Sequence, residues 1–177
     1  MPPRDVTRRP RRAVFPPPGH DHGRCSAEAL ANAEALCLAR GQRLTPIRRQ
    51  VLETLAASHK TLGAYEIMER LAGSGPRPAP ITVYRALDFL LANGLVHRIE
   101  SRNAFVACIS DHAQADGSAT TMFFICERCG AVGEASSPAV AETLQVAARA
   151  AGFTPKGRVI EITGICAHCG EGDVARR

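Results

Sequence analysis

Apolar residues recur at helical spacing in four stretches of the first half of the chain. Ser26 precedes the first stretch, and Gly41 follows it as a C-terminal stop. Thr45 and Pro46 suit the start of the second, because a hydroxyl caps free N–H groups and a proline needs no partner there. The pattern therefore predicts helices over about residues 26–40, 46–57, 64–72 and 82–93.

Two short alternating stretches follow the fourth predicted helix. Residues 95–100 and 104–109 lie on either side of the turn 101–103, which predicts a β-hairpin. A Gly/Pro-rich turn at 73–80 separates the third helix from the fourth. Helices followed by a hairpin are the order of elements in a winged helix–turn–helix, so we expect such a domain over residues 26–109.

The pattern changes after Ser110. Residues 110–121 are polar and turn-like, and apolar runs at 122–126 and 131–135 predict strands around a cysteine turn. An amphipathic helix at 138–151 and a strand at 159–165 follow. The predicted fold class is α+β, with a small α/β domain over residues 110–177 after the winged helix.

Charge and proline set the first residues apart. The net charge is +5, and residues 1–24 contribute +4 of it through six arginines against two aspartates. Their many prolines and lack of a hydrophobic period predict that residues 1–25 form a disordered basic tail, with nonspecific attraction to phosphate groups as the functional alternative. No apolar run is long enough to cross a membrane and no secretory signal is recognisable, which predicts a cytoplasmic protein.

Four of the seven cysteines form two C-x-x-C pairs with 36 residues between the pairs. Four thiolates satisfy a tetrahedral Zn²⁺ and leave no open position for catalysis. Gly130 and Gly170 follow the pairs directly, as expected where the backbone must turn sharply. We therefore predict a structural zinc site, with a dithiol redox switch as the alternative, formed by Cys126, Cys129, Cys166 and Cys169.

The fourth predicted helix begins with ITVYRAL. Its apolar positions are expected to face the core, which leaves Tyr84 and Arg85 projecting from the first turn. A helix–turn–helix presents this part of its second helix to base edges, where arginine pairs with guanine and an aromatic ring contacts thymine methyls. Thr82 is expected to contact a phosphate or cap the helix. The alternative is that Tyr84 packs partly and Arg85 is only a solvated charge.

The remaining histidines and cysteines carry weaker signals. His59 precedes the third helix and is a candidate ligand of an extra metal site. His20 and His22 lie in the predicted tail and are expected to be solvated. Cys25 and Cys37 have no partners at ligand spacing in the sequence.

The segments TPIRRQVLETL and ITVYRALDFL, the hairpin and the two C-x-x-C pairs together resemble the ferric uptake regulator family over about residues 30–170. The segments GAYEIMERL, TVYRALDFLLANGLVHRIES and MFFICERCGAVGE are most similar to its zinc uptake regulator subgroup. The resemblance implies a winged-helix domain, a C-terminal dimerisation domain and zinc-dependent repression of zinc-uptake genes.

The resemblance also implies a second, regulatory zinc site between the two domains. Its ligands would be His97, Cys108, His112 and Glu134, although His112 lies closer to Cys108 than the family pattern places its histidine. Mixed nitrogen, sulfur and oxygen donors suit Zn²⁺. Iron- and peroxide-sensing relatives usually carry a His-rich stretch before the first C-x-x-C, whereas residues 113–125 contain no histidine.

We therefore expect a zinc-responsive repressor that carries one structural and one regulatory Zn²⁺ per chain and binds palindromic operators of zinc-uptake genes in double-stranded DNA as a homodimer. No membrane partner, small-molecule substrate or enzymatic activity is expected. The alternatives are an iron, manganese or peroxide sensor of the same family, or a zinc-ribbon redox protein that does not bind DNA.

Overall fold

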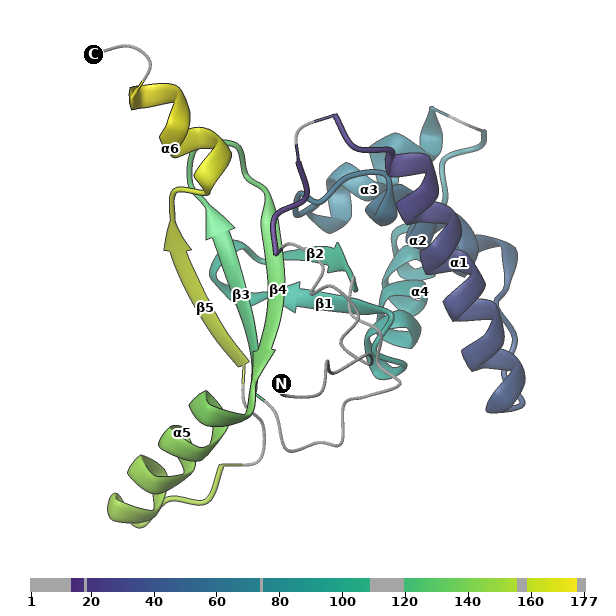
Figure 1. The fold of residues 1–177 in the computed structure, drawn as a ribbon. Coiled ribbons are helices and arrows are strands. Elements are labelled where there is room, and N and C mark those ends of the chain that lie inside the picture. The colour runs from purple at the N-terminus through teal and green to yellow at the C-terminus, as the bar shows by residue number, and fades with distance from the viewer. Residues whose placement is uncertain (1–13, 18, 74, 109–119, 156–158, 175–177) are drawn as a thin grey trace, which may run out of the picture.

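The computed structural model describes residues 14–17, 19–73, 75–108, 120–155 and 159–174. Figure 1 shows a helical lobe beside a sheet that runs from α5 at one end to α6 at the other, with a hairpin between the two. Among the described residues no helix is both long and apolar enough to span a bilayer. The arrangement is a winged helix–turn–helix followed by a small α/β domain, which confirms the predicted fold class.

The helical lobe contains four α-helices and the hairpin. The helices are α1 (His22–Ala39), α2 (Pro46–Ala56), α3 (Ala64–Ala72) and α4 (Pro80–Ala92). Strands β1 (Val96–Ile99) and β2 (Ala104–Ala107) pair antiparallel around the 3-10 turn η1 (Glu100–Arg102). Asn103 closes this turn with a φ of 45°, a conformation that asparagine tolerates better than most residues. This hairpin is the wing.

The core of the helical lobe is aliphatic. Val51, Leu52 and Leu55 of α2 are fully buried. They belong to one core cluster with apolar residues of α1, α3, α4 and the wing. Burial of each such side chain contributes about 1.5–3 kcal/mol. The apolar face of α4 points inward through Val83 and Leu87, and this orientation leaves the other face of α4 on the surface.

Two helices begin earlier than the sequence pattern predicts. Helix α1 begins at His22 because Asp21, rather than Ser26, is its cap: the Asp21 carboxylate accepts hydrogen bonds from the N–H groups of Gly23 and Arg24 at 2.9 and 3.4 Å. Helix α4 begins at Pro80, two residues before Thr82. The region predicted as a tail therefore includes the first turn of a helix, while residues 1–13 lie outside the described part of the chain.

The second domain is a three-stranded sheet with a helix at each end. Strand β3 (Thr120–Cys126) is central, antiparallel to β4 (Val132–Ser137) and parallel to β5 (Val159–Gly164). Helix α5 (Pro138–Ala150) is capped by Ser137, whose hydroxyl accepts a hydrogen bond from the N–H of Val140. Helix α6 (Ala167–Val174) was not predicted. Its sequence contains one member of the second cysteine pair, Cys169, and two glycines, which conceal any helical period.

The outer face of the wing packs on this sheet. Ile99 and Val106 of the wing form a buried cluster with Phe123, Ile125 and Val132 of the sheet. The alternation of a β-strand makes this possible, because Phe105 and Ala107 on the opposite face of the wing join the helical core. The wing is thus buried on both faces and forms an apolar contact between the two domains.

Candidate metal centres and nucleic-acid interface

The two C-x-x-C pairs come together at one end of the sheet. One pair lies at the turn after β3, the other lies at the start of α6, and the four sulfur atoms are all within 4.8 Å of one another. The Cys129 and Cys166 sulfurs are 3.9 Å apart. Sulfur ligands of a tetrahedral Zn²⁺ with bonds of about 2.3 Å lie about 3.8 Å apart, so the cluster fits this ion.

The surroundings favour the thiolate at one cysteine of the cluster and oppose it at others. Burial raises the pKa of the Cys126 thiol, but the backbone N–H groups of Cys129, Cys166 and Arg128 donate to its sulfur and lower the pKa to about 6. The N–H of Cys166 lies 3.4 Å from this sulfur. Burial and the neighbouring cysteine sulfurs instead raise the pKa of Cys169 to about 12. Four thiolates at this spacing therefore need a cation to coexist.

The two glycines beside the pairs differ. Gly130 has a φ of 73°, in the left-handed region, and its N–H donates to the Cys126 carbonyl at 3.0 Å. Gly170 lies inside α6, where its N–H donates to the Cys166 carbonyl at 2.9 Å. The expectation of a sharp glycine turn therefore holds for Gly130 only, since Cys166 directly precedes a helix and Cys169 lies in its first turn.

Three of the four predicted regulatory residues meet between the domains. His97 lies on β1, Cys108 follows β2 and Glu134 lies on β4, with ligand atoms within 4.8 Å of one another. The Cys108 sulfur is 3.5 Å from Glu134 Oε2, and His97 Nε2 is 3.5 Å from Glu134 Oε1. These separations suit a tetrahedral ion, for which nitrogen and oxygen ligands lie about 3.3 Å apart. His112 falls outside the described residues.

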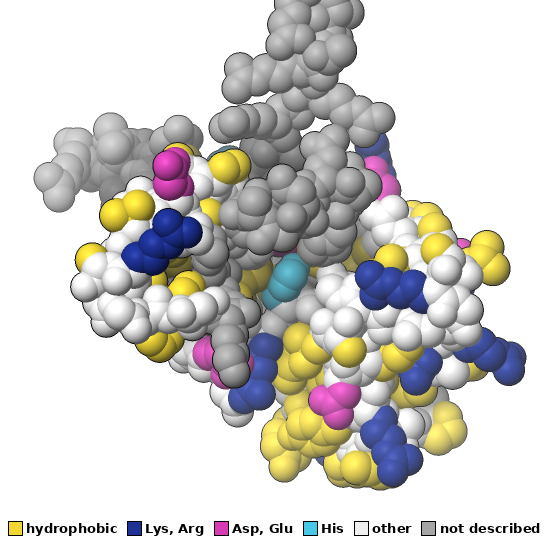
Figure 2. All heavy atoms as spheres, turned by 90° about the horizontal axis from the view of Figure 1, so that it is seen from below, with side chains coloured by type: hydrophobic (Ala, Val, Ile, Leu, Met, Phe, Trp, Pro, Cys, Tyr) yellow, Lys and Arg dark blue, Asp and Glu magenta, His cyan; other side chains and the backbone are white. Residues whose placement is uncertain are grey.

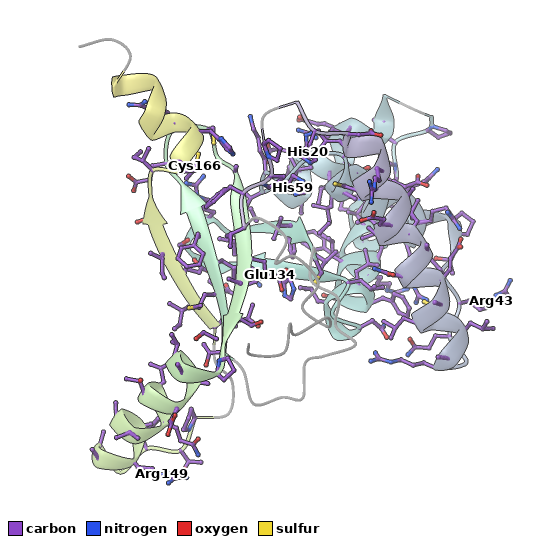
Figure 3. All side chains as sticks on the ribbon, in the orientation of Figure 1. His20, Arg43, His59, Glu134, Arg149 and Cys166 are labelled. Atoms are coloured by element: carbon purple, nitrogen blue, oxygen red, sulfur yellow. The ribbon has the colours of Figure 1, made fainter. Side chains whose placement is uncertain are left out.

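Strand register explains how Glu134 reaches the wing. Glu134 and Glu161 both pair with Phe123 on the central strand, one from each side, so these three side chains share one face of the sheet. The His97 ring lies 5.0 Å from the Phe123 ring, which places it on the same face. Only 6% of the Glu134 side chain is exposed, so its carboxylate is aimed at the junction of the domains (Figure 3).

A second carboxylate spans the same junction. Glu161 accepts hydrogen bonds from the N–H groups of Glu100 and Ser101 in the turn of the wing, at 2.7 and 3.1 Å. Burial raises the pKa of Glu161, but the bonds from Ser101 and Glu100 outweigh this effect and leave the pKa below its ordinary value. Sequence reasoning missed this residue, because nothing in its spacing indicated a partner in the wing.

Helix α4 leaves the three residues that are predicted to contact DNA on its surface. Thr82, Tyr84 and Arg85 are all exposed, and Tyr84 has 42% of its surface open. A shallow hollow between α4 and α2 is lined in part by Thr82, Arg85 and Arg48. Figure 2 shows Lys and Arg side chains distributed over the helical lobe, the side that carries α4. This face can accept a negatively charged backbone.

A third cluster joins residues that the sequence separates widely. His20 Nε2 lies 2.7 Å from His59 Nε2, and the Cys25 sulfur lies 3.8 Å from the same nitrogen. Figure 3 shows His20 and His59 facing each other where the N-terminal segment meets the loop between α2 and α3. His20 is thus a partner of His59 rather than a solvated residue. Sequence spacing concealed the group because His59 lies 34 residues from Cys25 and 39 residues from His20.

Comparison with known proteins agrees with this architecture. A sequence profile of the Ferric uptake regulator family matches residues 39–163. The chain is 41% identical to the Zinc uptake regulation protein of Escherichia coli (strain K12) over 84% of its own length and 85% of that protein. It is 33% identical to the Peroxide operon regulator of Bacillus subtilis (strain 168), over 73% of this chain and 85% of the relative. A solved zinc uptake regulator complexed with zinc and DNA superposes with a TM-score of 0.74 at 40% identity, over 84% of this chain and 97% of that one.

Proposed function

Because the chain belongs to the ferric uptake regulator family, we propose that it is a zinc-responsive transcriptional repressor. In its zinc-loaded form it would bind palindromic operators of zinc-uptake genes in the cytoplasm. The single observation that carries the proposal is the convergence of His97 and Cys108 from the wing with Glu134 from the sheet. The similarity to a zinc uptake regulator solved with zinc and DNA supports the same conclusion.

The proposed regulatory ion acts as a clamp between the domains. His97 and Cys108 move with the DNA-binding domain, whereas Glu134 belongs to the sheet, so an ion held by all three fixes the angle between them. We assign the fourth ligand to His112. In a dimer this angle sets the distance between two recognition helices, which must match half-sites about one helical turn apart. Zinc then favours the DNA-competent arrangement, and DNA reciprocally tightens zinc binding.

The four-cysteine cluster is assigned a second Zn²⁺ with a structural role. All four ligands belong to one domain, and the ion leaves no position for exchange or chemistry. It would join the turn after β3 to the start of α6. In this proposal the chain binds one regulatory and one structural zinc ion at these two sites. Since neither site is assigned a chemical reaction, we infer a binding protein rather than an enzyme.

Exposed apolar residues on the second domain support a homodimer. Val146 on α5, Phe153 after it and Val159 on β5 each leave more than 60% of their surface open. Strand β5 also lies at the edge of the sheet among the described strands. Exposed apolar side chains and an open sheet edge on one domain are both typical of a self-complementary interface.

Recognition of DNA is assigned to the first turns of α4. In this proposal Arg85 pairs with a guanine edge, Tyr84 contacts a thymine methyl and Thr82 binds a phosphate. The supporting observation is that all three side chains are exposed while Val83 and Leu87 bury the opposite face of the helix.

The experiment that tests the proposal is operator binding at buffered zinc, by fluorescence anisotropy with promoter fragments of zinc-uptake genes. Glu134→Gln keeps the size of the side chain but removes a charged ligand, and we expect operator affinity at saturating zinc to fall about 100-fold. Glu142→Gln on the exposed surface of α5 is the matched control and should bind as the unmodified chain does. Equal affinity for Glu134→Gln and the control would overturn the clamp.

The same titration separates zinc from other metals. A family member that senses iron, manganese or peroxide would bind the operator with Fe²⁺ or Mn²⁺ in place of Zn²⁺. The absence of histidine from residues 113–125 and the Cys108 thiol both favour zinc. Operator binding driven by Fe²⁺ but not Zn²⁺ would replace our assignment with the iron sensor.

A further inference from the structure

The third cluster has the donor set of a metal site. His20, Cys25 and His59 each present one ligand atom, and the three atoms lie within 4.8 Å of one another. They come from the N-terminal segment, the first turn of α1 and the loop that precedes α3. None of them belongs to the two sites described above.

The distances approach those of a bound ion. Around a tetrahedral Zn²⁺, two imidazole nitrogens lie about 3.3 Å apart, and a nitrogen and a sulfur lie about 3.6 Å apart. The corresponding separations here are 2.7 Å for His20 and His59 and 3.8 Å for Cys25 and His59. Small torsions of the side chains cover the difference of about half an ångström. Two imidazoles and a thiolate suit Zn²⁺ better than a hard cation.

His22 supplies an independent observation at the same place. Its ring centroid lies 4.2 Å from that of His20 and 5.2 Å from that of His59. Its Nδ1 atom is buried and has no hydrogen-bond partner among the described residues. A buried polar atom of this kind is costly unless a ligand or a water molecule satisfies it. A fourth donor therefore stands beside the three that already converge.

The cluster lies at the junction of the two domains. The His59 carbonyl accepts a hydrogen bond from the N–H of Val132 at 2.7 Å, and the next residue, Lys60, forms a β-bridge with Ala131. These partners directly follow the first cysteine pair. An ion at His59 would therefore act on the loop through which the helical lobe meets the sheet.

The N-terminal segment reaches the second domain as well. In Figure 1 it runs along β4 before it turns into α1. The Pro16 carbonyl lies 3.1 Å from His168 Nε2 on α6. Val14 lies so close to Gly133 that a Cβ added there would be 2.5 Å from Val14 Cγ1, so β4 needs a glycine at this point. The segment thus crosses from one domain to the other, and the cluster lies where it joins α1.

We propose that His20, Cys25 and His59 bind a third zinc ion, which fastens the N-terminal segment across the domain junction. The ion would take its fourth ligand from His22 or water. The competing explanation is a stack of imidazoles held by the hydrogen bond between His20 and His59 alone. This site is separate from the proposed regulatory site, and its existence does not depend on that assignment.

Cobalt(II) binding to the full chain tests the proposal, because a thiolate bound to cobalt gives a charge-transfer absorption in the near ultraviolet. The background variant is Cys108→Ser, which disables the proposed regulatory site and leaves zinc in the four-cysteine site. We expect one equivalent of cobalt to produce the absorption in this background and Cys25→Ser to abolish it. Cys37→Ser, a change in the same helix but at a residue outside the cluster, should leave the absorption intact.

Two further variants guard against a folding artefact. His20→Ala and His59→Ala keep all cysteines, and each should weaken cobalt binding at least about 10-fold while retaining the zinc of the four-cysteine site. Hydrogen exchange of residues 14–25 should slow on metal addition in the background variant and not in Cys25→Ser. No absorption in the background, or an absorption that survives Cys25→Ser, would overturn the site. Neither result bears on the proposed repressor function, since Cys108 is already absent.

Discussion

The four-cysteine cluster and the cluster of His97, Cys108 and Glu134 are built in opposite ways. The first draws all its ligands from one domain, from a turn and a helix start at the same end of one sheet. The second draws two ligands from the wing and one from the sheet of the other domain. A metal ion in the first cluster would stabilise a single domain, whereas a metal ion in the second would fix the angle between the two domains. In the proposed function, zinc concentration controls DNA binding through the second arrangement.

The largest effect should come from breaking the closed cluster. Cys166→Ser removes one of four ligands from a site whose metal contributes on the order of 10 kcal/mol of folding free energy. We expect the second domain to lose cooperative unfolding, and with it the dimer, as measured by calorimetry and sedimentation. Cys108→Ser is the control, because it should retain the structural zinc and a cooperative transition. A normally folded, dimeric Cys166→Ser protein would contradict the structural role.

The next effect should appear when the interdomain cluster is broken. Zinc per chain, measured by elemental analysis after a mild chelator, should fall by the regulatory ion, and by the ion of the third cluster where that site is filled, while the four-cysteine ion remains. Cys108→Ser should already lack that ion and should bind operator about 100-fold more weakly. If chelation removes no zinc from the unmodified chain, the assignment of His97, Cys108, His112 and Glu134 is wrong.

A smaller effect should separate DNA contact from both clusters. Tyr84→Ala should cost about 2 kcal/mol of operator binding, roughly 30-fold, with zinc content unchanged. Tyr65→Ala on α3 is the matched control, since Tyr65 is also an exposed tyrosine on a helix of the same lobe but does not lie on α4. Unchanged operator affinity in Tyr84→Ala would show that another face contacts DNA.

The smallest effect should come from the contact between Glu161 and the wing, which joins the two domains without a metal ion. The pKa of Glu161 is lowered in the folded chain, so its bonds to the wing are present above the ordinary value of 4.5 and are lost as pH falls through the lowered value. Glu161→Gln should therefore weaken the contact at neutral pH by at most about 1 kcal/mol and flatten the dependence of unfolding free energy on pH below about 4.5. If denaturant titrations of Glu161→Gln show the same loss of unfolding free energy at acid pH as the unmodified chain, Glu161 does not stabilise the junction.

Local signals in the sequence predicted most elements well. Helix α3 has the predicted bounds of Ala64–Ala72, and the strand positions differ by a few residues. The predictions were wrong where two residues compete as a helix cap, or where glycines interrupt the helical pattern of apolar residues. Asp21 caps α1 ahead of Ser26, and the glycines of α6 hide a helix whose first turn carries Cys169.

The candidate sites divide in the same way. Two C-x-x-C pairs indicate a metal cluster by spacing alone, because each pair brings two sulfurs together within a single turn. His97, Cys108 and Glu134 were identified through the family resemblance rather than through spacing. Nothing in the sequence joined Cys25 to His59, and only the path of the N-terminal segment across the junction does so.

The sequence by itself determined the secondary structure, the cysteine cluster and the membership of a regulator family, because these depend on periodicity, capping and short spacing. The tertiary structure decided which distant polar residues share a site. Both faces of the wing are buried, so the wing brings His97 and Cys108 against the sheet. The register around Phe123 turns Glu134 and Glu161 toward the wing. Such pairings depend on how apolar faces are buried against each other, and no local pattern along the chain records them.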